Sequence, residues 1–351
     1  MILPDKGVSV VVCCYNSQNR LPDTLKYLAN QAFERHISWE IVIVDNASTD
    51  DTFNVSLDLL NKLLPEKNFK VVSEPKPGLN HARKKGLELS QYEYVIFCDD
   101  DNWLSAEYLY KVFDLFEKHA DIGIVSGRTT GVYEIEPPDW FQTIQVSYAV
   151  GKQAPQSTIL NAVWGAGMGI RKSAYKELFA KGFKHMNLDR FQDKLYSGGD
   201  TELCYAFGLM GYKIWYEDSL HLWHFIPIQR LNFEYAKQLF YYIGYASPTI
   251  LVYGNHSENK RNKPFNWFKA FVKSVLWMIY TSILPSKSLS HKTGYPNALL
   301  VEVEKGRAVK LWQWKGSYKH LRQQVIDAEW NKKGSRISNN YHPVINFVDL
   351  E

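Results

Sequence analysis

Short apolar runs and amphipathic segments alternate over the first 130 residues. Each apolar run has the length and composition of a strand that is buried on both faces. These runs are Val8–Cys14, Trp39–Val44, Phe69–Val72, Tyr94–Cys98 and Ile122–Ser126. Between them, apolar residues recur at helical spacing, as at Leu21, Leu25 and Leu28. The alternation predicts an α/β fold with a mostly parallel central sheet that helices flank on both sides.

Four residues mark where the helices of this region begin or end. Ser48 and Ser105 are typical N-cap residues, and each precedes an apolar pattern of helical period. Gly78 opens a third helix, which continues to about Leu89, and Pro65 ends the helix that follows Ser48. Each strand should therefore end in a loop that leads into a helix.

The pattern changes after residue 130. Residues 131–160 are rich in loops and aromatic side chains. The elements predicted beyond them are a strand over Asn161–Ile170, a helix from Ser173, a helix over Thr201–Met210, a strand over Lys213–Tyr216 and a helix over Asn232–Tyr245. A polar break at His256–Pro264 precedes an aromatic, basic region. We therefore expect one domain in two halves, 1–130 and 131–254, and a helical C-terminal extension, 255–351.

Hydrophobic content, net charge and cysteine spacing limit the classes of protein to which this chain can belong. A chain of 351 residues with 45% hydrophobic residues can build a large core, and a net charge of +4 is too mild to require a nucleic-acid partner. The four cysteines have no metal-binding spacing, so we expect reduced core residues of a cytoplasmic protein. The chain shows no signal sequence at its start and no uncharged apolar run long enough to span a membrane.

Polar residues gather where the predicted strands end. The clusters are Cys13-Cys14-Tyr15-Asn16, Asp45-Asn46-Ala47-Ser48-Thr49-Asp50, Pro77-Gly78-Leu79-Asn80 with Arg83, and Asp99-Asp100-Asp101. Ligands of such sheets bind beyond the carboxyl ends of the strands. Three adjacent carboxylates repel one another unless a cation lies between them, and magnesium-type ions are held by carboxylates together with substrate phosphates. The triplet therefore indicates a site for a metal and a phosphorylated ligand.

The order and spacing of these clusters resemble those of the family 2 glycosyltransferases, over roughly residues 7–245. The resemblance implies the nucleotide-diphospho-sugar transferase fold of the GT-A type. It also implies that residues 1–130 bind a nucleotide-sugar donor and that residues 131–254 bind the acceptor and carry the catalytic groups.

The resemblance assigns a donor-binding role to the first three clusters. Tyr15 and the loop at Asn16 would contact the base, and Asp45 would accept its N–H group. The helix that carries Asn80 and Arg83 would lie near the base and the diphosphate. The structural alternatives are a carboxylate beside a helix N-terminus for Asp45 and a solvated basic stripe for Arg83.

The resemblance also implies a metal site that holds Mn²⁺ or Mg²⁺. Asp101 would ligate the ion, Asp99 would contact the ribose or the metal, and Asp100 would face the donor sugar. His224 would complete the metal sphere or contact phosphate, and Arg230 would pair with the diphosphate. The alternatives are an acidic turn for the triplet and an ordinary hydrogen-bonded side chain for His224.

Catalysis needs a base that takes the proton of the acceptor hydroxyl. Asp200 matches the position of the family's catalytic base, although Gly199 stands where the family usually has glutamate. Glu202 would support Asp200, and Gly167, in a segment of small residues, would lie beside the donor sugar. The alternatives are a helix N-cap for Asp200 and tight strand packing for the glycine segment.

The segment 264–284 is apolar and aromatic, with Lys269 and Lys273 one helical turn apart. Such a helix could lie at the inner face of the cell membrane, beside a lipid-linked acceptor. The alternatives are packing on the catalytic domain or contact within a homodimer.

The sequence as a whole predicts a metal-dependent, inverting glycosyltransferase. Its donor would be a nucleotide sugar, with a UDP-sugar favoured, and its acceptor a glycan or lipid-linked hydroxyl in bacterial surface polysaccharide synthesis. Two alternatives stay open. A sugar nucleotidyltransferase would carry a glycine-rich loop after the first strand, where this chain has Cys13-Cys14-Tyr15-Asn16-Ser17. A non-catalytic nucleotide-sugar-binding protein would not need Asp200.

Overall fold

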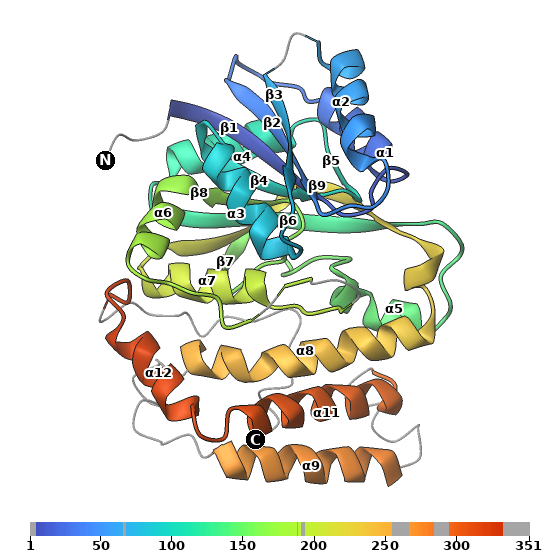
Figure 1. Cartoon of the computed structure of the whole chain (residues 1–351), viewed down its shortest axis with the longest axis vertical. Helices are drawn as coiled ribbons and strands as arrows, with labels where there is room; N and C mark the ends of the chain where they lie inside the picture. Colours follow the sequence, from blue (N-terminus) through green and yellow to red (C-terminus); the bar gives the residue numbers. More distant parts are fainter. Residues whose placement is uncertain are drawn as a thin grey trace.

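The computed structural model describes residues 5–65, 68–187, 189–190, 194–254, 267–283 and 295–332. Within these ranges, a central sheet with flanking helices forms the upper part of the molecule, and further helices form layers below it (Figure 1). The polar break predicted at His256–Pro264 lies outside the described residues.

One mixed sheet contains the nine strands of the described residues, in the order β3-β2-β1-β4-β8-β6-β9-β5, with β7 paired to β9. The strands are β1 (Asp5–Cys14), β2 (Trp39–Asn46), β3 (Phe69–Glu74), β4 (Tyr92–Asp99), β5 (Asn102–Leu104), β6 (Ile122–Tyr133), β7 (Thr158–Leu160), β8 (Met168–Arg171) and β9 (Lys213–Ile226). The strands β1 to β4 are parallel, as predicted. β8 then runs antiparallel to both β4 and β6, so it is inserted between two strands that run in the same direction.

The parallel strands are buried on both faces, which explains their continuous apolar runs. On β1, Val11 packs into one apolar core, and Val10 and Val12 pack into the core on the other face. β2 repeats this division with Val42 and Ile41. The sheet therefore holds its carboxyl ends rigidly in place between two packed layers.

The helices of the described residues cover both faces of the sheet and continue below it. They are α1 (Leu21–Ala29), α2 (Thr52–Leu63), α3 (Leu79–Leu89), α4 (Tyr108–Lys118), α5 (Phe141–Ile144), α6 (Lys172–Ala180), α7 (Gly199–Leu209), α8 (Phe233–Gly254), α9 (Trp267–Ile283), α11 (Asn297–Gln313) and α12 (Tyr318–Asp327). α3 begins directly after Gly78, as predicted.

Two predicted helix starts are wrong. α2 begins at Thr52, because the Ser48 hydroxyl accepts the backbone N–H of Asn16 at 3.0 Å and does not cap a helix. α4 begins at Tyr108, whose N–H donates to the backbone carbonyl of Ser105 in the turn before the helix. In both cases a contact within the loop takes the place of the expected cap.

Several predicted elements differ in length, and one of them is the strand expected over Ile122–Ser126, which continues to Tyr133. The segment 161–167 is a loop, so only the end of the expected strand is β8. The strand expected over Lys213–Tyr216 continues to Ile226, and the helix expected over Asn232–Tyr245 continues to Gly254. The predicted ends of this strand and this helix come too early, because each element continues beyond the residues that share one hydrophobic period.

The C-terminal helices stack on α8. α11 packs against α8 on one side and against α9 on the other (Figure 1). Glycines allow the close crossing of α8 and α11, because a methyl group at Gly306 would overlap the carbonyl oxygen of Tyr241, and one at Gly244 would overlap that of Val303. Among the helices that the structure describes, none has both the length and the hydropathy to cross a membrane.

Replacing Gly306 by alanine is expected to lower the free energy of unfolding by about 1–3 kcal/mol, because the two helices would have to move apart. Gly316 is the matched control, since a methyl group there would meet nothing within 4 Å. Thermal unfolding of both variants would test this prediction. Equal unfolding temperatures for Gly306→Ala and Gly316→Ala would show that the crossing tolerates the added group.

Candidate active site

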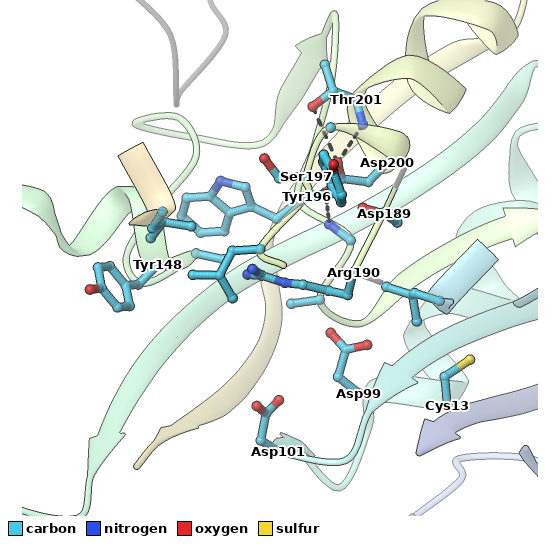
Figure 2. Close-up of a pocket in the computed structure, with 18 of the residues that line it drawn as sticks. Cys13, Asp99, Asp101, Tyr148, Asp189, Arg190, Tyr196, Ser197, Asp200 and Thr201 are labelled. Atoms are coloured by element: carbon cyan, nitrogen blue, oxygen red, sulfur yellow. Dashed lines mark hydrogen bonds between the residues drawn. The ribbon is translucent and has the colours of Figure 1, made fainter. Parts of the chain in front are cut away.

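A cavity of about 450 Å³ lies at the carboxyl ends of β1 and β4. Its walls also come from α3, from the loop before α7, from the end of β9 and from α8. Figure 2 shows Asp99 and Asp101 on one side of this space and Asp189 and Asp200 on the other. Apolar side chains such as Leu239 of α8 line another part of the cavity.

The cavity gathers predicted site residues from both halves of the domain. Those that line it are Tyr15, Arg83, Asp99, Asp100, Asp101, Asp200, His224 and Arg230. The predicted residues outside its lining are Asn16, Asp45, Asn80, Gly167 and Glu202. The carboxylate triplet and Asp200 therefore face one space, although they lie about a hundred residues apart in the sequence.

Asp101 is the most strongly paired member of the triplet. Its Oδ2 accepts a hydrogen bond from Arg230 Nη1 at 2.9 Å, and its Oδ1 lies 3.6 Å from His224 Nε2. Burial raises the pKa of Asp101, but Arg230 and His224 outweigh it and hold the pKa well below its usual range. Asp101 is therefore ionised at neutral pH.

The donor set at Asp101 fits a divalent cation. A carboxylate oxygen and an imidazole nitrogen face each other there, and both are ligands for ions of the Mn²⁺ type. Within the described ranges, no group of three His, Cys, Asp or Glu side chains could hold a metal. Asp101 and His224 would therefore hold the ion only together with ligands from a bound substrate, as phosphates provide for Mg²⁺ in many enzymes.

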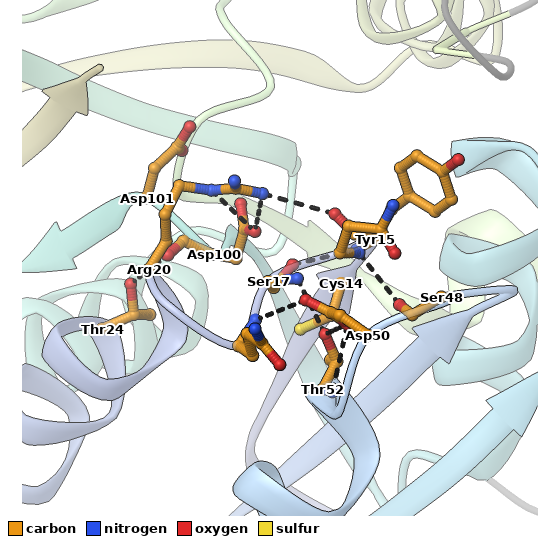
Figure 3. Close-up of polar contacts among 12 residues, drawn as sticks. Cys14, Tyr15, Ser17, Arg20, Thr24, Ser48, Asp50, Thr52, Asp100 and Asp101 are labelled. Carbon is orange, nitrogen blue, oxygen red and sulfur yellow. Dashed lines mark hydrogen bonds and ion pairs between the residues drawn. The ribbon is translucent and has the colours of Figure 1, made fainter. Parts of the chain in front are cut away.

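The other two aspartates of the triplet have different surroundings. Burial raises the pKa of Asp99 to about 6, with Arg83 opposing the rise and Asp101 adding to it. Asp100 Oδ2 instead accepts hydrogen bonds from Arg20, the residue before α1, from Nε at 3.1 Å and from Nη2 at 2.6 Å (Figure 3). This oxygen of Asp100 is thus paired with Arg20, and the expected contact of Asp100 with the donor sugar stays a prediction.

Hydrogen bonds to neighbouring segments fix the loop after β1. Arg20 donates to the carbonyl of Tyr15 at 3.3 Å, and the Ser17 N–H donates to Thr52 Oγ1 at 2.7 Å (Figure 3). Asn16 has a left-handed backbone conformation, with φ of 50°, and its Oδ1 accepts the N–H of Thr49 at 2.8 Å. Asn16 therefore shapes this loop, while Tyr15 reaches the cavity.

Two polar side chains lie at the end of β2. Asp45 has a carboxylate oxygen without a partner in the described structure, and the Asn46 amide holds a neighbouring segment. Asp45 is 9% exposed, and in the described structure its buried Oδ1 has no hydrogen-bond partner. The side chain of Asn46 accepts the N–H of Gly78 at 2.8 Å and so holds the start of α3 beside the cavity. An orphaned buried acceptor at this edge is suited to a ligand N–H group.

Arg83 places its guanidinium group in the wall of the cavity. Its Nη1 donates to Asp189 Oδ2 at 3.1 Å, while in the described residues its buried Nε has no partner. Gly165 makes this arrangement possible, since a methyl group there would come within 3.0 Å of Arg83 Nη2 and 3.2 Å of Asp200 Oδ2. Arg83 and Asp200 thus both lie close to Gly165.

Asp200 lies in the first turn of α7 and not at its N-cap, which is Gly198. Its Oδ2 accepts the N–H of Gly165 at 2.9 Å, and its Oδ1 accepts the N–H of Thr201 at 2.7 Å. Each carboxylate oxygen has two acceptor sites. The carboxylate is therefore held in one orientation and can still accept a hydrogen bond from a group in the cavity.

Glu202 is buried on the far side of the same helix. It accepts hydrogen bonds from the backbone N–H groups of Met186, at 2.8 Å, and Asn187, at 3.0 Å, and from the Tyr253 hydroxyl at 2.7 Å. These contacts connect α7 to α8 and to the loop that leads to Asp189. Glu202 therefore holds this loop in place, and its supporting role in catalysis stays a prediction.

Glu202→Gln is expected to lower the free energy of unfolding by about 1–3 kcal/mol, because an amide NH₂ would then face groups that are themselves donors. Glu234→Gln is the control, since Glu234 is 76% exposed and pairs only with Lys237 one turn away. Denaturant unfolding followed by circular dichroism would measure the difference. A Glu202→Gln protein as stable as the control would show that the carboxylate is not needed to hold the loop.

Gly167 has a structural explanation of its own. It has a φ of +65°, its carbonyl accepts the Tyr108 hydroxyl at 2.8 Å, and a side chain there would crowd Tyr108 and Leu222. Its position supports the tight-packing alternative more than a contact with the donor sugar. Asn80 lies on α3 outside the cavity lining.

The sequence did not identify several residues that line the cavity. Asp189 and Arg190 come from a loop without a motif, and Figure 2 shows Arg190 extending between the two groups of aspartates. Arg20 was not singled out either. The apolar wall was also missed, and its residues are Val146, Tyr148, Leu195, Tyr235, Leu239 and Ile243.

Comparison with known proteins identifies the family of the N-terminal half. Residues 9–179 match the family model described as Glycosyl transferase family 2. A poly-β-1,6-N-acetyl-D-glucosamine synthase of Staphylococcus epidermidis is 23% identical over 226 residues, which make up 63% of this chain and 50% of the relative. A synthase of the same name from Staphylococcus aureus has the same identity and coverage. The chain therefore spans about half the length of the curated relatives that it matches.

Solved structures agree with the architecture. The crystal structure of GalNAc-T7 with UDP, GalNAc and Mn²⁺ superposes with a TM-score of 0.53 at 16% identity, over 90% of this chain and 57% of that one. A crystal structure of S. aureus TarS in complex with UDP has a TM-score of 0.46 at 18% identity, over 90% of this chain and 91% of that one. The mixed sheet and its flanking helices form the predicted GT-A type of fold.

Proposed function

We propose that the chain transfers a sugar from a nucleoside diphosphate to a hydroxyl group of a glycan or lipid-linked acceptor, because its residues 9–179 match the model of glycosyl transferase family 2. Uridine diphosphate is the first nucleotide to consider. One observation carries the proposal: Asp101, Arg83 and Asp200 come from separate segments and line one cavity. Opposite charges placed on two sides of one space suit a diphosphate leaving group and a hydroxyl nucleophile.

The donor would lie along the carboxyl ends of β1, β2 and β4. The buried Oδ1 of Asp45 lacks a partner in the described structure, and an N–H group of the base would satisfy it. Tyr15 is 45% exposed and would cover one face of the base. Arg83 and Arg230 both line the cavity, and their guanidinium groups would pair with the diphosphate oxygens.

The reaction would be a single displacement at the anomeric carbon of the sugar. Asp200 takes the proton of the acceptor hydroxyl while that oxygen attacks from the face opposite the diphosphate. The new carbon–oxygen bond forms as the bond to the diphosphate oxygen breaks, and the bonding pair leaves with the diphosphate. One displacement inverts the anomeric configuration, so no enzyme nucleophile is required.

Charge on the departing diphosphate needs stabilisation as the bond breaks. Arg83 and Arg230 would supply part of it from positions that the fold already fixes. A divalent cation held by Asp101 and His224, when bound, would add Lewis-acid stabilisation of the same charge. Residues 1–130 would thus hold the base and part of the diphosphate, and residues 131–254 would supply Arg230, His224, Asp200 and the acceptor side.

Release of UDP from a panel of UDP-sugars would test the proposal without a known acceptor, because water can replace the acceptor hydroxyl. The panel would begin with UDP-N-acetylglucosamine, since the Staphylococcus epidermidis relative is named a poly-β-1,6-N-acetyl-D-glucosamine synthase. We expect slow release from one donor in the presence of Mn²⁺ or Mg²⁺. Failure of every donor, together with no UDP binding by calorimetry, would reject the proposal, whereas binding without turnover would favour a non-catalytic protein.

A further inference from the structure

Helix α9 exposes large apolar side chains where a helix on a water-facing surface usually carries polar ones. The large apolar side chains that it exposes are Phe268 at 55%, Leu276 at 60%, Ile279 at 47%, Tyr280 at 52% and Ile283 at 77%. Its fully buried side chains are the small residues Ser274 and Thr281, each 2% exposed, and the half-buried Phe271 and Met278 lie on the same side. The outward face of α9 is therefore apolar.

The two polar residues on the inward side of α9 can be buried because they are small. Ser274 and Thr281 lie two turns apart on one side of the helix, the side that packs against α11. The Thr281 hydroxyl donates to the carbonyl of Trp277 at 2.8 Å, so it needs no water. Small residues at a helix contact are typical of packing in which the apolar faces point toward lipid.

The outward side chains form one continuous stripe. At about 100° per residue, the five exposed apolar residues of α9 fall within an arc of roughly 120°. Lys273 is exposed at one edge of this arc and Lys269 just inside the same edge, and α9 contains no acidic residue. On α11, Trp312 is 50% exposed and packs against Phe271, with ring centroids 5.3 Å apart. The stripe therefore has cations along one edge and an exposed tryptophan beside it.

We propose that this outward face of α9, together with Trp312, binds the surface of a membrane that contains anionic lipids, with the helix lying in the plane of the surface. An apolar stripe with lysines at its border matches the acyl boundary and the phosphate groups of such a surface. A second copy of the chain fits the face less well, because α9 offers no carboxylate to pair with the lysines of a partner helix.

Co-sedimentation of the full chain with lipid vesicles would test the proposal. We expect binding to vesicles of phosphatidylglycerol and phosphatidylcholine, weaker binding to phosphatidylcholine alone, and a decrease as salt is added. The triple variant Leu276→Gln/Ile279→Gln/Ile283→Gln should bind the anionic vesicles roughly tenfold less tightly or worse. Lys269→Gln/Lys273→Gln should lose roughly tenfold on anionic vesicles and little on neutral ones.

The matched control is Leu57→Gln/Ile135→Gln, which removes exposed apolar side chains elsewhere, 38% and 44% exposed respectively. This control should bind vesicles as the wild type does. All the variants change exposed positions, so their unfolding temperatures should agree, and UDP binding should not change. UDP binding thus separates this proposal from the proposed function.

Two results would overturn the proposal. One is a wild-type chain that does not bind anionic vesicles, or a triple variant that binds them as well as the control. The other is a wild-type dimer in sedimentation equilibrium that the triple variant dissociates while vesicle binding stays absent. That result would make the face a contact between subunits.

Discussion

Replacing Asp200 by asparagine is expected to lower the rate of sugar transfer by about 100- to 10,000-fold, which is the usual contribution of a general base. The carboxylate lines the cavity and is oriented by the N–H groups of Gly165 and Thr201. An amide in the same place could still accept one of these hydrogen bonds, but it could not take a proton from the acceptor. UDP binding should change far less than the rate, because the side chains proposed to hold the base and the ion, Asp45, Tyr15 and Asp101, are unaltered.

A second variant separates loss of the base from damage to the fold. Asp200→Glu keeps the carboxylate and moves it by about one methylene group, so it should also be slow, since small misplacements of a reacting group cost about 100-fold. Asp23→Asn on α1 is the control for removing an exposed carboxylate, and it should be fully active. An Asp200→Asn protein that transfers sugar at the wild-type rate with normal UDP affinity would remove the base assignment.

The parallel half of the sheet could be predicted because its strands are buried on both faces. Such strands leave continuous apolar runs, and β1 to β4 were found where those runs lie. β8 could not be separated from the apolar residues before it, because the loop 161–167 has a similar composition. Ser48 was misread for a related reason: its hydroxyl meets the Asn16 N–H from another loop, a contact that local sequence does not reveal.

The candidate site was predictable where it depends on strand ends. The triplet after β4 and the residue Tyr15 after β1 lie beside the cavity, because parallel strands bring their carboxyl ends to one edge. Asp189 was not predictable, since Glu202 of α7 holds its loop through contacts between distant parts of the chain. The roles of the site residues, including the metal ligands, stay predictions until the variants are measured.

Replacing Asp101 by asparagine is expected to abolish the increase in UDP affinity that Mn²⁺ produces, with a loss of about 100-fold or more. Asp101 Oδ1 and His224 Nε2 are the two protein groups that fit the ion, and the asparagine would remove the negative charge between His224 and Arg230. Asp100→Asn is the matched comparison, because that neighbouring carboxylate pairs with Arg20. Its effect on metal dependence should be much smaller.

Chelation decides whether the cation at Asp101 is a metal ion or the Arg230 guanidinium. Arg230 already lies 2.9 Å from Asp101, so it is a cation that the fold supplies without any metal. If a metal ion acts there, EDTA should lower the rate of the wild-type enzyme strongly and the rate of Asp101→Asn no further, because both changes remove the same interaction. If EDTA leaves the wild-type rate unchanged while Arg230→Gln lowers it, the guanidinium performs the role alone and the metal assignment is wrong.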